Sequence, residues 1–298
     1  MFENVLVGVD GGGGGRDAIA LTRQLGGERA RYLLMNTVSR PPLGRGAAVW
    51  LPACCHYAEE LLKRERSETG IDAGLAIGWE RSPARALQDR ALREGSDLVV
   101  VGASHRHHLL RLLLGDDAIA TVDRSPCAIA IAPSGYRARH GAWTTIAVGD
   151  DGSPQSARAL NVARGLSSSR HAAIQAVSVI GPENLSYREL MLREWSAAAG
   201  RIQDSGQAQL DTTRGADGRV PHDDAVDLLA DLSDEVDLLI VGTRRQGPVR
   251  RWINGSTARR LAGRTRCPLL ILPSNSRAAT VAPAGPSRDP RALSGRET

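Results

Sequence analysis

The chain has 298 residues, which is enough for about two ordinary domains. Its content of 42% hydrophobic and 24% charged residues is that of a globular protein. No apolar run is long enough to span a bilayer, and residues 1–4 lack the features of a signal peptide, so we expect a cytoplasmic protein without a membrane partner.

The positive charge does not indicate nucleic-acid binding. The formal net charge is +5, but Lys63 is the only lysine, so nearly all of the positive charge is arginine, spread over many segments. Nucleic-acid-binding proteins usually carry a clustered basic stripe, and those that bind single strands carry aromatic side chains on which bases stack. Aromatic residues make up only 3% of this chain. We therefore expect no nucleic-acid partner.

The first half of the chain predicts strands that alternate with helices. Short runs of β-branched residues and leucine bounded by glycine are typical of strands buried on both faces. The predicted strands cover about residues 5–9, 32–38, 73–77, 98–101 and 127–132. The predicted helices cover about residues 16–26, 56–68, 82–94 and 115–123.

After Pro133 the same pattern starts again. The predicted strands are near residues 145–148, 173–179, 207–213, 238–241 and 269–272. The predicted helices cover about residues 154–166, 184–204 and 225–233, and a further helix opens at Gly255. Ser153 is a good N-cap for the first of these helices, and Pro154 is a good first helical residue.

The two halves match in register, which indicates a domain duplication. Equivalent residues are about 140 positions apart, too far for a solenoid repeat. The matched pairs are Asp10 and Asp151, Val38 and Val179, Gly102 and Gly242, Gly115 and Gly255, and Cys127 and Cys267. We expect domains at residues 1–135 and 142–274. The tail, residues 275–298, has no periodicity and is predicted to be disordered.

Alternating strands and helices predict the α/β class, with a parallel sheet and helices on both faces. Such sheets bind ligands beyond the carboxyl ends of their strands, where the winding direction reverses. Asp10 and Asp151 each follow a first strand, so either could contact a ligand there; each could equally be a turn and cap residue that starts the next helix.

Gly255-Ser256 lies at the start of a predicted helix, after a strand and a loop. Free backbone N–H groups, a hydroxyl and the positive end of a helix dipole together can hold a phosphate. A plain helix cap would use the same two residues. The preceding strand, turn and loop favour the phosphate site.

These residues resemble the tandem universal stress proteins. Nucleotide-binding members of that family carry, after the fourth strand, a glycine, two residues, a second glycine, nine residues, and then glycine with serine or threonine. The second half has Gly242, Arg245 in place of the middle glycine, and Gly255-Ser256. The first half has Gly102, His105, Gly115 and then Asp116. The first-strand Asp-Gly pairs and the second-strand valines match as well.

The resemblance implies a five-stranded parallel sheet in each domain, of strand order 3-2-1-4-5, and ATP as the ligand. It also implies that the two domains pair through their fifth strands, and it leaves a homodimer open. The implied nucleotide-binding residues are Asp151, Val179, Gly242, Arg245, Gly255, Ser256 and Thr257 in the second domain, and Asp10, Val38, Gly102 and Gly115 in the first.

The departures from the family pattern favour the second domain as the main site. Asp116 would accept the N–H bonds that a phosphate needs and would repel it by a few kcal/mol, on the order expected for partly buried like charges. Arg245 could either obstruct the close approach of a phosphate or bind it through its guanidinium group. An ATP-independent dimerising scaffold, with both loops degenerate, is the alternative that these departures leave open.

Other chemistry has little support in the sequence. The chain has no G-x-x-x-x-G-K-[ST] motif, and no nucleophile–base pair at a diagnostic spacing, so a dedicated hydrolase is not indicated, although slow ATP hydrolysis stays open. His105, His107 and His108 cluster, but a zinc site needs three or four convergent ligands. None of the four cysteines forms a C-x-x-C pair, so we expect no metal.

Overall fold

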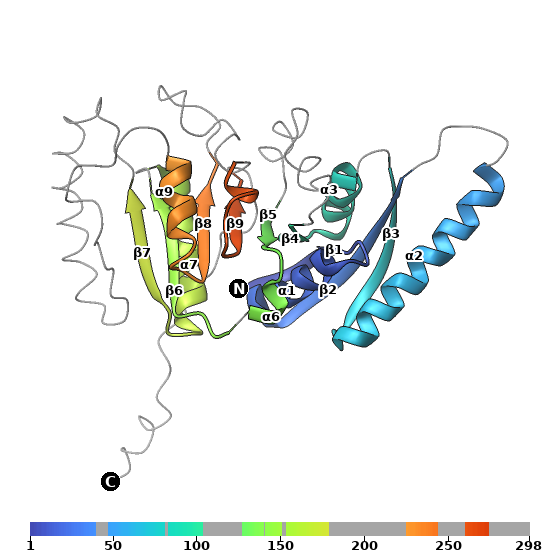
Figure 1. Ribbon diagram of the computed structural model, residues 1–298, viewed down its shortest axis with the longest axis horizontal. Coiled ribbons are helices and arrows are strands. Elements are labelled where there is room, and N and C mark those ends of the chain that lie inside the picture. The colour runs from blue at the N-terminus through green and yellow to red at the C-terminus, as the bar shows by residue number, and fades with distance from the viewer. Residues whose placement is uncertain are drawn as a thin grey trace, which may run out of the picture.

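The computed structural model describes residues 1–39, 47–80, 83–103, 127–139, 141–150, 153–178, 225–243 and 260–273. Over these residues the chain forms two α/β units that share one nine-stranded sheet (Figure 1). The predicted α/β class and tandem organisation are confirmed. The predicted tail and the segments 184–204 and 207–213 lie outside the described residues.

The first unit contains five parallel strands in the order β3-β2-β1-β4-β5. This order confirms the expected 3-2-1-4-5 arrangement. The strands are β1 (Phe2–Gly8), β2 (Gly26–Ser39), β3 (Ala73–Glu80), β4 (Leu98–Gly102) and β5 (Ala128–Ala132). Because β1 and β4 are neighbours, the winding direction reverses between them, and their carboxyl ends frame the expected crevice.

The second unit repeats this arrangement in its described part, with the order β9-β8-β6-β7. Its strands are β6 (Thr145–Asp150), β7 (Ala173–Ser178), β8 (Leu238–Gly242) and β9 (Leu269–Leu272). Strand β6 pairs with β8 as β1 pairs with β4, so the second crevice has the same two flanking strands.

The two units join through β5 and β9, the last described strand of each. The two strands are antiparallel, and Ala130 pairs with Leu270 at the centre of the contact. Both strands are fully buried, which covers two apolar strand edges that would otherwise invite aggregation. The predicted pairing of the domains through their fifth strands is therefore present within the chain.

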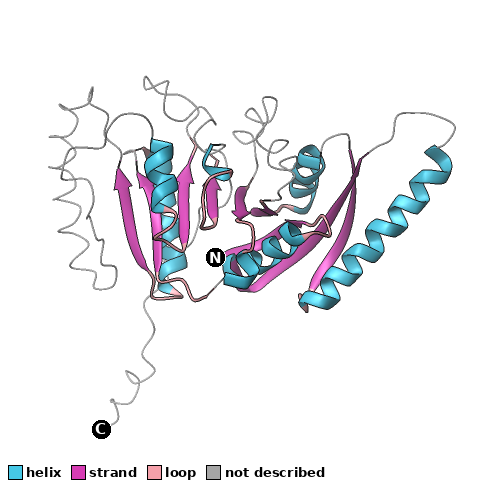
Figure 2. Cartoon of the chain, in the orientation of Figure 1, coloured by secondary structure: helices cyan, strands magenta, loops and turns pink. Residues whose placement is uncertain are grey.

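Helices cover both faces of the sheet (Figure 2). The described helices are α1 (Gly13–Leu25), α2 (Ala47–Thr69), α3 (Pro83–Glu94), α6 (Tyr136–Arg139), α7 (Pro154–Ser168) and α9 (Ala225–Leu232). Alternate residues of one strand enter different cores: Val5 and Val7 pack in the core that contains residues of α1, α2 and α7, whereas Leu6 packs in the core that contains residues of α3 and α9. Among the described helices, none has the length and apolar character needed to cross a membrane.

Several boundaries differ from the sequence prediction, among them the starts of three elements. Helix α1 begins at Gly13 rather than Arg16, because the glycine run is held by a capping carboxylate described below. Strand β2 begins at Gly26 rather than near Tyr32, because its polar first half pairs with the start of β1 through a register shift. Helix α2 begins at Ala47 rather than near His56 and continues through Pro52, for which the described contacts give no physical reason.

Candidate functional site

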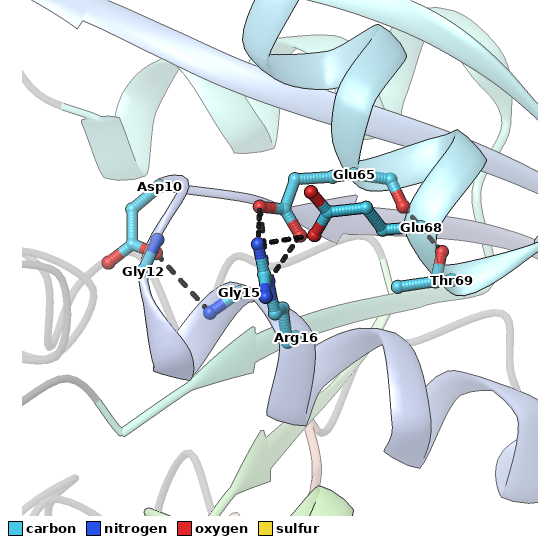
Figure 3. Close-up of polar contacts among 7 residues, drawn as sticks. All are labelled: Asp10, Gly12, Gly15, Arg16, Glu65, Glu68 and Thr69. Carbon is cyan, nitrogen blue, oxygen red and sulfur yellow. Dashed lines mark hydrogen bonds and ion pairs between the residues drawn. The ribbon is translucent and has the colours of Figure 1, made fainter.

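In the first domain, Asp10 lies where the carboxyl ends of β1 and β4 frame the expected crevice. Val7 pairs with Val100, so the strand register brings Val9 level with Gly102, and Asp10 follows at the carboxyl end of β1. The N–H groups of Gly12 and Gly15 donate to Asp10 Oδ1 at 2.9 and 3.3 Å (Figure 3). The carboxylate thus caps the start of α1 while its side chain stays exposed.

Gly102 lies under the first turn of α1. A β-carbon at Gly102 would stand 2.0 Å from the backbone oxygen of Gly14. In the second domain, a β-carbon at Gly242 would stand 3.0 Å from the β-carbon of Gln155, in the first turn of α7. Gly102 and Gly242, two of the four glycines predicted as ligand contacts, therefore have a packing reason to be glycine, in addition to any role with a ligand.

Val38 is half-buried near the carboxyl end of β2, where it pairs with Trp79 of β3. Asn36, on the same strand as Val38, was missed by the sequence reasoning. Asn36 donates its side-chain N–H to the carbonyl of Val9 at 2.7 Å, which fixes the end of β1 beside the crevice. A polar amide inside an apolar strand was the signal that could have indicated it.

Most residues predicted for the second crevice lie outside the described residues. These are Asp151, Val179, Arg245, Gly255, Ser256 and Thr257. Gly115 of the first domain and the histidines at positions 105, 107 and 108 lie outside them as well. Within the described part of the chain, no three histidine, cysteine or acidic side chains come together as metal ligands would.

The described rim of the second crevice consists of Asp150, Gly242 and Thr243. Val148 pairs with Ile240, so the buried Asp150 lies level with Gly242 at the ends of β6 and β8. Thr243 follows directly and is fully buried, and its hydroxyl has no hydrogen-bond partner among the described residues. Sequence reasoning missed Thr243, which is equivalent to Ala103 in the first domain.

The two domains cap their first helices differently. In the second domain the Ser153 hydroxyl accepts the N–H of Ser156 at 3.1 Å, and Pro154 occupies the first helical position, as the sequence predicted. Gly15 is the residue equivalent to Ser156, and its N–H donates to Asp10 instead. The N–H group at this position of the first helix is thus bonded to Asp10 in the first domain and to Ser153 in the second.

Comparison with known proteins agrees with this architecture. The model of the universal stress protein family matches residues 1–133 and 142–273. A universal stress protein from Archaeoglobus fulgidus superposes with a TM-score of 0.63 at 16% identity, over 91% of this chain and 96% of that one. A functionally unknown protein from Pseudomonas aeruginosa gives a TM-score of 0.56 at 16% identity, over 92% of this chain and 93% of that one. A search of curated proteins finds no match. With both halves matched by the family model, the chain belongs to the universal stress protein family.

Proposed function

We propose that this protein binds ATP, chiefly in the crevice of its second domain, and acts as a cytoplasmic regulatory module in a stress response. Binding would bias domain pairing or the choice of partner rather than drive turnover. Membership of the universal stress protein family and the duplicated pair of crevices support a ligand at the carboxyl ends of the strands.

The difference between the two helix caps is the reason for placing the ATP site in the second domain. Asp10 Oδ1 is engaged by two backbone N–H groups of its own loop, so a ribose hydroxyl would have to compete for that oxygen. In the second domain Ser153 supplies the helix cap, because its hydroxyl accepts the N–H of Ser156. We therefore assign the ribose contact to Asp151.

The remaining contacts follow from the glycine-loop pattern. Gly255, Ser256 and Thr257 would provide N–H groups and hydroxyls to the phosphates, with Arg245 as a guanidinium contact and Val179 beside the base. Burying an unpaired hydroxyl costs about 1–3 kcal/mol. A ligand atom that reached the Thr243 hydroxyl would offset that cost, so Thr243 is a further candidate contact.

Calorimetric titration of the full chain with ATP tests the proposal. We expect one saturable site of micromolar to millimolar affinity. Ser256→Asp should weaken binding at least tenfold, because the new carboxylate would occupy the anion site and repel phosphate. Asp151→Ala should also weaken binding, whereas Asp10→Ala, the same change at the equivalent residue of the first domain, should leave the affinity unchanged. Absence of saturable binding at millimolar ATP would refute the proposal.

An ATP-independent scaffold is the second candidate, and one observation favours it. The packing of Gly102 against Gly14 and of Gly242 against Gln155 accounts for both glycines without a ligand. In that case the nine-stranded sheet would act as a dimerising scaffold, and the purified protein should retain no adenine nucleotide. Mass analysis of the small molecules released from purified, denatured protein distinguishes the two: bound ATP or ADP excludes the scaffold, and its consistent absence favours it.

A further inference from the structure

The carboxyl-terminal ends of α1 and α7, the first helix of each domain, meet at the connection between the domains. Arg170, two residues beyond α7, reaches both helices: its Nη1 donates to the carbonyl of Leu166 in α7 at 3.2 Å, and its Nη2 donates to the carbonyl of Gln24 in α1. We propose that Arg170 latches these two helices together and thereby couples the two crevices, so that a change at one crevice alters the stability of the helix at the other.

The latch uses carbonyl groups at two helix ends. The last four carbonyls of a helix have no partner within the helix, and they carry the negative end of the helix dipole. Leu166 and Gln24 each supply one of these carbonyls, so a single guanidinium group lies at the negative ends of two helices. Within the described part of the chain, no carboxylate forms an ion pair with Arg170, and its other hydrogen bond is to the Ser169 hydroxyl at 2.9 Å.

The indole ring of Trp143 also holds this guanidinium group. Arg170 Cζ lies 5.0 Å from the centroid of the ring, within the range of a cation–π interaction. Trp143 is 2% exposed, and its Nε1 donates to the hydroxyl of Tyr136 at 3.1 Å. Burial removes part of the water around the charge, which lowers the pKa of Arg170 from its ordinary value. The charge therefore depends on its protein partners, and these fix the position of Arg170.

The connection between the domains is bonded to α1 at two further points. The buried carboxylate of Asp17 accepts the N–H groups of Gly135 and Arg137 at 2.8 and 2.9 Å, and the side-chain N–H of Gln24 donates to the carbonyl of Gly141 at 3.2 Å. The two buried aromatic residues of the connection belong to a core that includes residues of both α1 and α7. The described part of this connection is therefore a packed segment rather than a free tether.

Each latched helix begins at a crevice. Helix α1 starts beside Asp10, whose carboxylate accepts the N–H of Gly15 in its first turn. Helix α7 starts after Ser153, and its first turn packs against Gly242. Coupling between distant sites is carried by rigid elements and the hydrogen bonds that join them. A change at the start of one helix therefore alters the contacts of Arg170 and, through them, the other helix.

Amide hydrogen exchange of the full chain, followed by mass spectrometry, tests this coupling without any ligand, so the result does not depend on ATP binding. Ser153→Ala removes the N-cap of α7 in the second domain, and the amides of α7 should exchange faster. We expect the amides in the last turn of α1, in the first domain, to exchange about threefold faster as well. Those of α3, which Arg170 does not contact, should be unchanged.

The same experiment in an Arg170→Met background should show no effect of Ser153→Ala on α1, because both donors of the latch are gone. Arg170→Lys is a gentler second background: it keeps the charge but replaces two nitrogen donors with one, so the effect on α1 should be smaller. Arg164→Met is the matched control, since it removes the same charge from an exposed residue of α7 that donates to Asn161 of its own helix. It should leave the effect on α1 intact.

Three results would overturn the inference. If Ser153→Ala left α1 unchanged, the two helices would not be coupled. If α1 exchanged faster to the same extent with and without Arg170, the coupling would run through the sheet instead. If α1 and α3 exchanged faster alike, the variant would have lowered the stability of the whole fold.

Discussion

The backbone oxygen of Gly14 lies 2.0 Å from the point where a β-carbon on Gly102 would stand. These residues belong to the first turn of α1 and the last position of β4, so the contact seats the helix on the sheet beside the first crevice. A methyl group would force the helix and strand apart, and backbone atoms on the opposing side cannot rotate away.

Gly102→Ala should therefore lower the free energy of unfolding by about 3 kcal/mol, the upper part of the range for overpacked sites. Gly242→Ala should cost less, because its nearest atoms are 3.0–3.1 Å away. Gly13→Ala is the control: no atom lies within 4 Å of its added β-carbon, so stability should be unchanged or slightly higher. Urea titrations followed by tryptophan fluorescence measure all three, and equal losses for Gly102→Ala and Gly13→Ala would contradict the packing explanation.

The Arg16–Glu65 pair should be important for stability because Glu65 is fully buried. Arg16→Ala would leave that carboxylate unpaired and should cost about 3–5 kcal/mol. The double variant Arg16→Met/Glu65→Leu should recover most of the loss, since it removes both charges together. Lys63→Ala, which breaks exposed pairs with Glu59 and Glu60, should have no measurable effect in the same urea titrations. A double variant no more stable than Arg16→Ala would show that packing, not charge, dominates.

Asp97 in the first domain and Asp237 in the second should stabilise the fold in the same way. Asp97 accepts the N–H groups of Glu3 and Asn4 at 2.8 and 3.0 Å, and Asp237 accepts those of Thr144 and Thr145 at 2.7 and 3.0 Å. Asp97 thereby links the start of β4 to the start of β1, and Asp237 links the start of β8 to the start of β6.

Asp97→Ala and Asp237→Ala should each cost about 1.5–3 kcal/mol, the value of hydrogen bonds to a charged group. Asp89→Ala, an exposed change on α3, should stay within about 0.5 kcal/mol. Amide hydrogen exchange should show faster exchange at the start of β1 in the first variant and of β6 in the second. If either single variant exchanged faster at the starts of both β1 and β6, the effect of that aspartate would not be local to its own domain.

Alkaline pH should destabilise the protein through two buried groups. Burial raises the pKa of Tyr136 from 10.0 to about 12, and that of the Cys267 thiol from 9.0 to about 12. A pKa raised in the folded state means that the neutral form stabilises the fold below the unfolded pKa, and that this contribution is lost as the pH rises through the folded pKa. Stability should therefore fall between about pH 9 and 12, and Tyr136→Phe should reduce the slope above pH 10.

Absorbance of tyrosinate at rising pH provides the direct measurement for Tyr136. Its hydroxyl also accepts the indole N–H of Trp143 at 3.1 Å, so tryptophan fluorescence should change in the same range. Ionisation of all four tyrosines near pH 10 in the folded protein would contradict the burial argument.

The strands could be predicted because their sequence pattern is local. Runs such as residues 98–101 and 269–272 carry the apolar signal of doubly buried strands, and the Ser153-Pro154 cap follows from side-chain chemistry alone. Helix α6 could not be predicted, because four residues carry no periodicity and its anchor, Asp17, is far away in sequence.

Some features of the candidate site could likewise be predicted from the sequence, and others could not. The positions of Asp10 and Gly102 at one end of the sheet follow from strand order, which the resemblance supplied. The packing of Gly102 against Gly14 could not be inferred, because it arises from the distance between a helix and a strand that the sequence does not encode locally.

The antiparallel contact between β5 and β9 determines how the two crevices are oriented. All strands of the first unit run one way, and those of the second run the other, so the carboxyl ends of the two sets lie at opposite rims of the shared sheet. A single small ligand cannot bridge the crevices, and bound molecules would not repel one another directly. Each rim can therefore hold its own ligand without direct interference from a ligand at the other.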